Sequence, residues 1–251
     1  ASAWSHLVMV PPVLGWANDY GVQVEMAIHA GSLLAVLAYF WRETLRLARG
    51  GGLLLSARMT GDGRLLLLLL LATLPVAAVS FALRDNVGLL RENYAAIAAA
   101  TIGFGLLLYA VDAAFMQVRR IEHMGPVNAL IFGLAQVAAL LPGTSRAGIT
   151  MTAGRFLGFE RLEAARFAML MSVPVGIGQV ALLARGWLAG GASTGFEGAA
   201  LLAGALAFAA ALAAIAFLMA WLKRASFGIF ALYRVLAGAG ILYWYYALRG
   251  A

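Results

Sequence analysis

The chain has 251 residues, of which 63% are hydrophobic and only 12% are charged, and its mean hydropathy is +0.89. Charged residues make up about a quarter of a soluble domain, so this composition excludes an ordinary soluble fold. The net charge of +7 comes from arginines spread through short segments between apolar runs, which is typical of a membrane protein and not of a nucleic-acid binder. The sequence contains no cysteine, which excludes disulfides and thiolate metal sites.

Six apolar stretches approach or exceed the ~20 residues that a helix needs to cross a bilayer. They occupy residues 22–41, 64–83, 94–115, 164–184, 196–222 and 227–248. Pro75 and Pro174 interrupt two of them, which membrane helices tolerate when neighbours satisfy the freed carbonyl groups. We therefore predict an all-α integral membrane protein with about six transmembrane helices.

Two further apolar pieces, residues 128–141 and 149–159, are too short to cross a membrane. The turn "PGTSRAG" (142–148) joins them, so we predict a re-entrant hairpin made of two half-helices. The opening segment "SAWSHLVMVPPVLGW" (2–16) is typical of the second arm of another such hairpin. We expect the first arm of that hairpin to lie upstream of the chain.

Basic residues gather in segment 42–64, at 119–120 and at 223–224, and counting the spans places these three regions on one side of the membrane. Cytoplasmic loops carry an excess of Lys and Arg, so we expect this side to be cytoplasmic. The hairpin around PGTSRAG then enters from the cytoplasmic side, and the first hairpin enters from the outer side.

A weak internal repeat relates the two halves of the chain: "LGW" (14–16) corresponds to "LGF" (157–159). We predict a single polytopic membrane domain over 1–251. Residues 1–115 would form the first repeat, incomplete at its N-terminus, and residues 116–251 the second. Inverted-topology repeats of this kind place a site near the membrane midplane, where broken helices point their N-termini at anions.

The PGTSRAG turn has the composition of an anion site. Thr144 or Ser145 can cap the half-helix that follows, whose N-terminus offers free N–H groups and partial positive charge. Arg146 adds a planar cation that suits phosphate oxygens, and Gly143 and Gly148 allow close backbone approach. The alternative is that Arg146 pairs with a carboxylate or with helix carbonyls, but the cost of an intramembrane charge favours function. Thr144 and Ser145 are equally well explained as ligands or as hydroxyls that cap and join helices.

Four other polar residues are candidates for the same site. His6, in the other hairpin arm, is a general acid, base or nucleophile, or else an interfacial side chain that touches water. Glu25 and His29 share one helix face, where they line the cavity or form a satisfied buried pair, and we favour the first. Gln136 points into the hairpin and binds a ligand or a carbonyl group. We expect His123, in a charged loop, to be a solvated surface residue.

These residues carry a resemblance to a known family. "GLAQVAALLPGTSRAGITMTAGRFLGFERLEAARFAMLMSVPV" (133–175) closely resembles the undecaprenyl-diphosphate phosphatase family of the bacitracin-resistance type, which has a PGxSRSG-like loop. Segment 2–16 is similar to the first hairpin of that family, usually written SSxGH, and "VEMAIHAGSLLAVLAYFW" (24–41) is similar to its next helix. The resemblance covers nearly the whole chain.

The resemblance implies a phosphatase of the bacterial inner membrane that removes the terminal phosphate from a C55 isoprenoid diphosphate. This reaction recycles the lipid carrier of cell-wall synthesis, and the family is associated with bacitracin resistance. The matching positions imply Arg146 and Ser145 for diphosphate binding, His6 for acid–base or nucleophilic work, and Ser2 for a supporting hydroxyl. The resemblance also implies a divalent metal, Mg²⁺ or Ca²⁺, and a site open to the periplasmic side.

The sequence departs from the family pattern at several places. An E-x-x-x-E element precedes the first hairpin in the family, and this chain begins after that position, so we expect its carboxylates to lie upstream or to be lacking. Ala3 stands where the second serine is usual, and Ser5 stands where the glycine is usual. Ala147 replaces the serine of SRSG, and His29 replaces a glutamine.

Two other functions fit the same features. Inverted repeats with broken helices are also a transporter architecture, so the anion site is compatible with a carrier or flippase. An inactive binder of an anionic (phospho)lipid is the third possibility, given the departures above. Small residues along 198–216 suit close helix packing within one chain or between two, which leaves a homodimer open.

Overall fold

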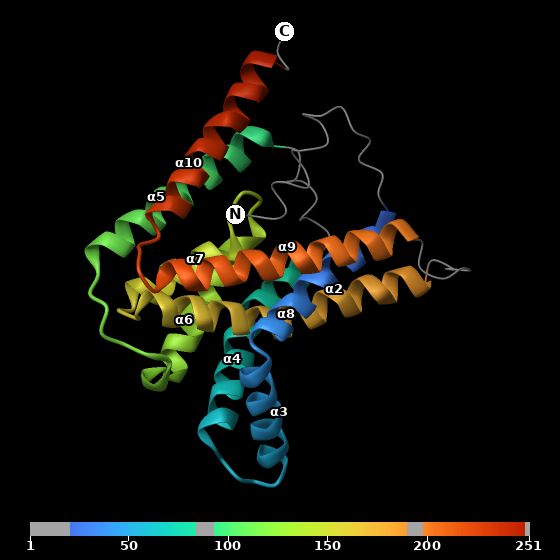
Figure 1. The fold of residues 1–251 in the computed structure, drawn as a ribbon, viewed down its shortest axis with the longest axis vertical. Coiled ribbons are helices and arrows are strands. Elements are labelled where there is room, and N and C mark those ends of the chain that lie inside the picture. Colours follow the sequence, from blue (N-terminus) through green and yellow to red (C-terminus); the bar gives the residue numbers. More distant parts are fainter. Residues whose placement is uncertain (1–20, 84–92, 190–197, 249–251) are drawn as a thin grey trace. The chain divides into compact units, whose positions relative to one another are not determined.

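The computed structural model describes residues 21–83, 93–189 and 198–248, and these residues form helices (Figure 1). The bounds are α2 Gly21–Tyr39, α3 Trp41–Leu55, α4 Gly61–Ala82, α5 Tyr94–Ala114, η2 Ile121–His123, α6 Pro126–Val137, η3 Ala138–Leu140, α7 Arg146–Phe156, α8 Arg161–Ala189, α9 Gly198–Leu222, α10 Gly228–Tyr243 and η4 Trp244–Leu248. Within the described residues, β-type pairing is confined to an isolated bridge between Arg119 and Phe159. The predicted all-α class is confirmed.

Six helices of the described ranges are long and apolar enough to cross a membrane, namely α2, α4, α5, α8, α9 and α10 with its extension. They coincide with the six predicted spans, although their ends differ by a few residues. Helix α4, for example, begins at Gly61 and not at Arg64, because the Thr60 hydroxyl accepts a hydrogen bond from the Gly63 N–H at 3.1 Å. The chain is a multi-pass membrane protein.

Segment 42–64 differs from the expected basic loop, because most of it forms helix α3. The three consecutive glycines and the arginines of this segment make its helical pattern hard to recognise in the sequence. In the helix, Gly50 faces α4. A Cβ on Gly50 would lie 2.5 Å from the Gly63 nitrogen, so the two backbones pack closely at this point. Tertiary packing therefore stabilises a helix that local propensity disfavours.

The described residues fall into two compact units. One unit contains residues 71–168 and 222–248, and the other contains residues 21–70 and 169–221. In the second unit, α2 and α9 cross where Gly31 faces Gly204, whose own added Cβ would lie 3.1 Å from the Ala27 carbonyl oxygen. The small residues of α9 thus pack within one chain at this crossing, while the homodimer stays a prediction.

In the first unit, α5 and α10 lie side by side (Figure 1). Gly105 leaves room for Arg234, and Gly238 leaves room for Ile102, so glycines let the two helices approach. The α6–α7 hairpin packs within the same unit, where the Phe132 ring fills the space beside Gly154. This unit contains the PGTSRAG turn.

A buried ionic cluster fixes the end of the hairpin that lies away from this turn. Asp112 of α5 accepts hydrogen bonds from Arg155 Nε at 2.7 Å, from Arg161 Nε at 2.9 Å and from the Phe227 N–H at 3.2 Å. The cluster joins the C-termini of α5 and α7 to the start of α8 and to the turn before α10. The cluster fixes these four segments relative to one another. Its role is therefore to stabilise the fold and not to bind the anion.

Candidate functional site

The loop between α6 and α7 depends on a glycine. After the short helix Ala138–Leu140 the chain turns through Gly143, whose φ of +92° lies in the left-handed region. A side chain at Gly143 would also overlap the carbonyl oxygen of Ile97 on α5. The predicted pair of short helices joined by this turn is confirmed, and its re-entry into the membrane stays a prediction.

Ser145 is the residue that caps α7. Its backbone is extended, with φ −77° and ψ 121°, and its Oγ accepts a hydrogen bond from the Gly148 N–H at 3.2 Å. The N–H groups of Arg146 and Ala147 come before the first intrahelical hydrogen bond and have no acceptor within the helix. An anion at this end of α7 would meet those N–H groups and the positive end of the helix dipole.

Arg146, the first residue of α7, is half-buried. Its guanidinium makes no hydrogen bond and no ion pair with any described residue. In the structural alternative, Arg146 would pair with a carboxylate or with helix carbonyls. Arg146 has no such partner in ranges 21–83, 93–189 and 198–248. A cation held in this way is available to an external anion.

A second arginine lies beneath the same loop. Arg234 of α10 is buried, and it donates a hydrogen bond from Nη2 to the Gly143 carbonyl oxygen at 3.1 Å and one from Nε to the Thr101 carbonyl oxygen at 3.2 Å. The Thr101 hydroxyl lies 3.2 Å from the same Gly143 oxygen. Sequence reasoning missed both residues, although an arginine inside an apolar span is a recognisable signal of function.

Two buried polar side chains of the hairpin lack partners among the described residues. They are Gln136, which is 0% exposed and unpaired at both Oε1 and Nε2, and Thr144, which is unpaired at Oγ1. Buried polar groups are nearly always hydrogen-bonded, so unpaired ones mark a place for water or for ligand atoms. Gln136 and Thr144 keep their predicted assignment to the site.

Glu25 and His29 lie in the other unit, on one face of α2 as predicted. His29 Nε2 is 3.9 Å from Glu25 Oε1 and 2.9 Å from the Gln179 side-chain nitrogen. The direction of the hydrogen bond between His29 and Gln179 depends on the tautomer of the ring. The sequence did not single out Gln179, and the lining of a shared cavity stays a prediction.

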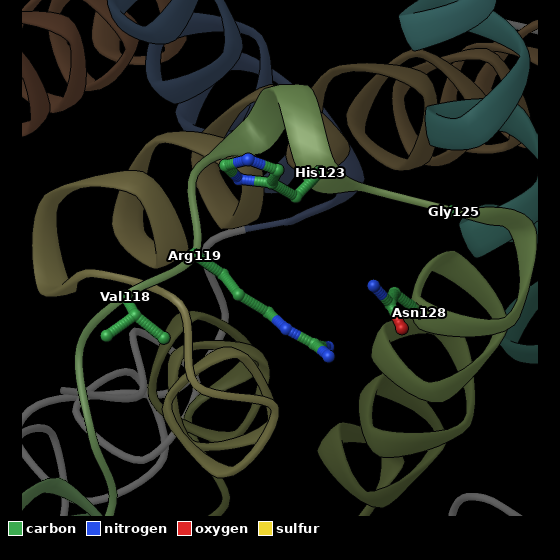
Figure 2. Close-up of a pocket in the computed structure, with 5 residues that line it drawn as sticks. All are labelled: Val118, Arg119, His123, Gly125 and Asn128. Atoms are coloured by element: carbon green, nitrogen blue, oxygen red, sulfur yellow. The ribbon is translucent and has the colours of Figure 1, made fainter.

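His6 and Ser2 lie outside the described residues, so their place relative to Arg146 stays a prediction. His123 is exposed as expected, and its Nδ1 accepts a hydrogen bond from the Arg120 N–H at 3.1 Å. Together with Val118, Arg119, Gly125 and Asn128, His123 lines a pocket of about 490 Å³ (Figure 2). Figure 2 shows Arg119 and Asn128 pointing toward each other. This pocket adjoins the start of α6, so a helix about 18 Å long separates it from the PGTSRAG turn.

Comparison with known proteins decides the family. Residues 1–240 match the family model described as bacitracin resistance protein BacA. The chain belongs to this family. Undecaprenyl-diphosphatase 1 of Rhodospirillum rubrum is 43% identical, over 96% of this chain and 87% of its own length. The undecaprenyl-diphosphatase of Maricaulis maris is 43% identical over 96% and 91%, and that of Roseobacter denitrificans is 38% identical over 98% and 92%.

The divalent metal implied by the family resemblance stays a prediction, because the described residues offer no complete set of donors for it. No three His, Cys, Asp or Glu side chains converge anywhere in ranges 21–83, 93–189 and 198–248. Asp112 already accepts hydrogen bonds from two arginines, and Glu25 with His29 provides only a pair. A stable site for a hard cation needs more oxygen ligands than this pair supplies.

Proposed function

We propose that this chain is an undecaprenyl-diphosphate phosphatase. Water cleaves the terminal phosphoanhydride bond of the C55 isoprenoid diphosphate, which releases inorganic phosphate and leaves the isoprenoid monophosphate. Membership of the bacitracin resistance protein family and the similarity to several undecaprenyl-diphosphatases support this activity. The structural observation that carries the proposal is Arg146, a cation at the N-terminus of α7 that has no partner among the described residues.

The terminal phosphate binds at the start of α7 in this proposal. Arg146 donates two parallel hydrogen bonds to its oxygens, as a guanidinium does to a phosphate, and the first N–H groups of α7 donate to the others. Charge builds up on the transferring phosphoryl oxygens and on the leaving oxygen in the transition state. Fixed positive groups stabilise that charge without reorganising.

Proton transfer is assigned to His6, with Ser2 as a supporting hydroxyl. His6 either takes the proton of the attacking water or attacks phosphorus itself, in which case water hydrolyses the phosphohistidine in a second step. Ser145 contributes by ordering the loop, since its hydroxyl caps α7. A divalent metal belongs to the proposal only through the family resemblance.

The membrane arrangement of the substrate follows from its chemistry. The prenyl chain lies in the bilayer or between spans, among apolar side chains, and the diphosphate reaches the loop. We place the open side of the site in the periplasm of a bacterial inner membrane, as the family resemblance implies. A chain whose basic segments 42–64, 119–120 and 223–224 lie in the cytoplasm allows this placement.

Release of inorganic phosphate from a polyprenyl diphosphate tests the function. The purified chain is assayed in detergent, with and without added divalent metal, beside its Arg146→Ala variant. Phosphate release by the wild type and its loss in the variant are expected. Substrate movement seen only in sealed vesicles would indicate a carrier, and retention of diphosphate lipid without turnover would indicate a binder.

A further inference from the structure

Helix α3 presents three distinct faces along its length. One face packs on α4, with Gly50 buried beside Asp62 and Gly63. Leu47 and Leu54 lie on the same side, at the spacing that keeps residues on one helix face. The other two faces are exposed.

The second face is apolar and exposed. It consists of positions 41, 45, 48, 52 and 55, which recur at helical spacing and are all exposed. Trp41 is 53% exposed, Leu45 is 47% exposed and Leu55 is 92% exposed. Large apolar side chains at this spacing, uncovered by the chain, are suited to contact with lipid.

The third face is basic. Arg42, Arg46 and Arg49 recur at the same helical spacing, and all three are exposed. None of the three pairs with a described carboxylate, and the Arg42 guanidinium lies over the Trp41 ring, 5.3 Å from its centre. The nearby acidic residues are Glu43, in the first turn of α3, and Asp62, at the start of α4. The arginines outnumber them, so this face is positive.

The position of α3 along the chain places it at a membrane surface. Helix α2, which is a candidate span, ends at Tyr39, and the chain bends at Phe40 before α3 begins (Figure 1). Trp41 follows at once, and tryptophan is enriched where helices leave the hydrocarbon core. A helix with Trp and Leu on one face and arginines beside them matches the pattern of helices that lie in the interface.

We propose that α3 is an interfacial helix whose Arg42, Arg46 and Arg49 bind the phosphate groups of anionic phospholipids. The apolar face contacts the upper part of the acyl chains, and the arginines reach up to the phosphates with their aliphatic stems over the same lipids. This lipid site is separate from the PGTSRAG turn and goes beyond the proposed phosphatase activity.

Native mass spectrometry of the full-length chain in detergent tests the proposal, with phosphatidylglycerol and phosphatidylcholine as probes. Near a membrane surface, each arginine contributes about fivefold to the affinity for anionic lipid. The R42Q/R46Q/R49Q variant is therefore expected to lose about 100-fold in phosphatidylglycerol binding and to keep its phosphatidylcholine binding. Phosphate release in detergent is expected to be unchanged.

Two matched variants separate the site from charge and from folding. R42K/R46K/R49K keeps the charges and is expected to keep phosphatidylglycerol binding. R185Q/K223Q/R224Q removes three other exposed charges, and it too is expected to bind normally. If both glutamine variants lost phosphatidylglycerol binding equally, the loss would be due to net charge alone and the proposal would be overturned. Unchanged binding in R42Q/R46Q/R49Q, or a loss in the lysine variant as large as in the glutamine variant, would also overturn the proposal. If the triple glutamine variant unfolds, Arg46→Gln alone is expected to show about a fivefold loss.

Discussion

Arg234 of α10 donates a hydrogen bond to the carbonyl oxygen of Gly143, 91 residues earlier in the chain, at a distance of 3.1 Å. This bond attaches the turn that precedes Arg146 to a transmembrane helix. Because Gly143 sits in the left-handed region and has no room for a side chain, the turn requires glycine at this position. Arg234 is thus a positioning residue for the anion site.

Replacing Arg234 is expected to lower kcat more than it raises KM. Arg234→Met removes the bonds to Gly143 and Thr101, and a displacement of about 1 Å in a catalytic group can cost about 10²-fold. Arg234→Lys should recover part of kcat, since an ammonium can still donate to the Gly143 oxygen. Steady-state phosphate release measures both constants. An Arg234→Met variant that folds and retains normal kcat would remove Arg234 from loop positioning.

Replacing Arg146 is expected to abolish most activity without lowering stability. Arg146→Ala should reduce kcat/KM by about 10²- to 10³-fold, because a preorganised positive group is lost from the transition state. Its thermal unfolding midpoint should stay the same or rise, since no residue in the described ranges pairs with Arg146. Arg146→Lys should restore only part of the rate, because the bidentate geometry is absent.

Arg119→Ala is the control for Arg146, since Arg119 is an exposed arginine beside the pocket of Figure 2. Its phosphate release is expected to equal that of the wild type. Near-normal turnover by Arg146→Ala, measured beside this control, would exclude Arg146 from the mechanism.

The sequence was sufficient to predict elements whose signals are local. The six spans follow from their apolar length, and the helix–loop–helix around PGTSRAG follows from a Pro-Gly break and the hydroxyl cap of Ser145. Helix α3 was not predicted, because three glycines and several arginines in a short segment are typical of a loop. What stabilises it is the close packing of Gly50 on Gly63, which no local pattern reveals.

The partners of buried polar residues could not be predicted for the same reason. Arg234 and Asp112 are visible in the sequence as charges within apolar spans, which marks them as important. Their assignments differ, however: Arg234 holds the anion loop, whereas Asp112 binds two arginines far from it. Only the packing of helices that are distant in sequence shows whether a buried charge positions the anion site or stabilises the fold.

Asp112→Asn is expected to destabilise the protein by about 3–5 kcal/mol, because it leaves the buried Arg155 and the half-buried Arg161 without a counter-charge. Asp62→Asn, at an exposed carboxylate, is the control and should change stability by no more than about 0.5 kcal/mol. Denaturant unfolding in detergent micelles measures both. A loss in Asp112→Asn no larger than that of the control would mean that backbone carbonyls alone hold Arg155.

Gln136→Met tests whether the unpaired amide of the hairpin serves the substrate. Methionine is similar in length to glutamine and removes both unsatisfied polar atoms, so the free energy of unfolding without substrate should rise by about 1–3 kcal/mol. If Gln136 binds an oxygen of the diphosphate, KM should rise by about 10- to 100-fold, the value of one hydrogen bond to a charged group. Thr144→Val makes the same kind of change at the other unpaired group and should act in the same direction. Destabilisation by Gln136→Met with an unchanged KM would instead assign the amide to a structural hydrogen bond, through water, within the fold.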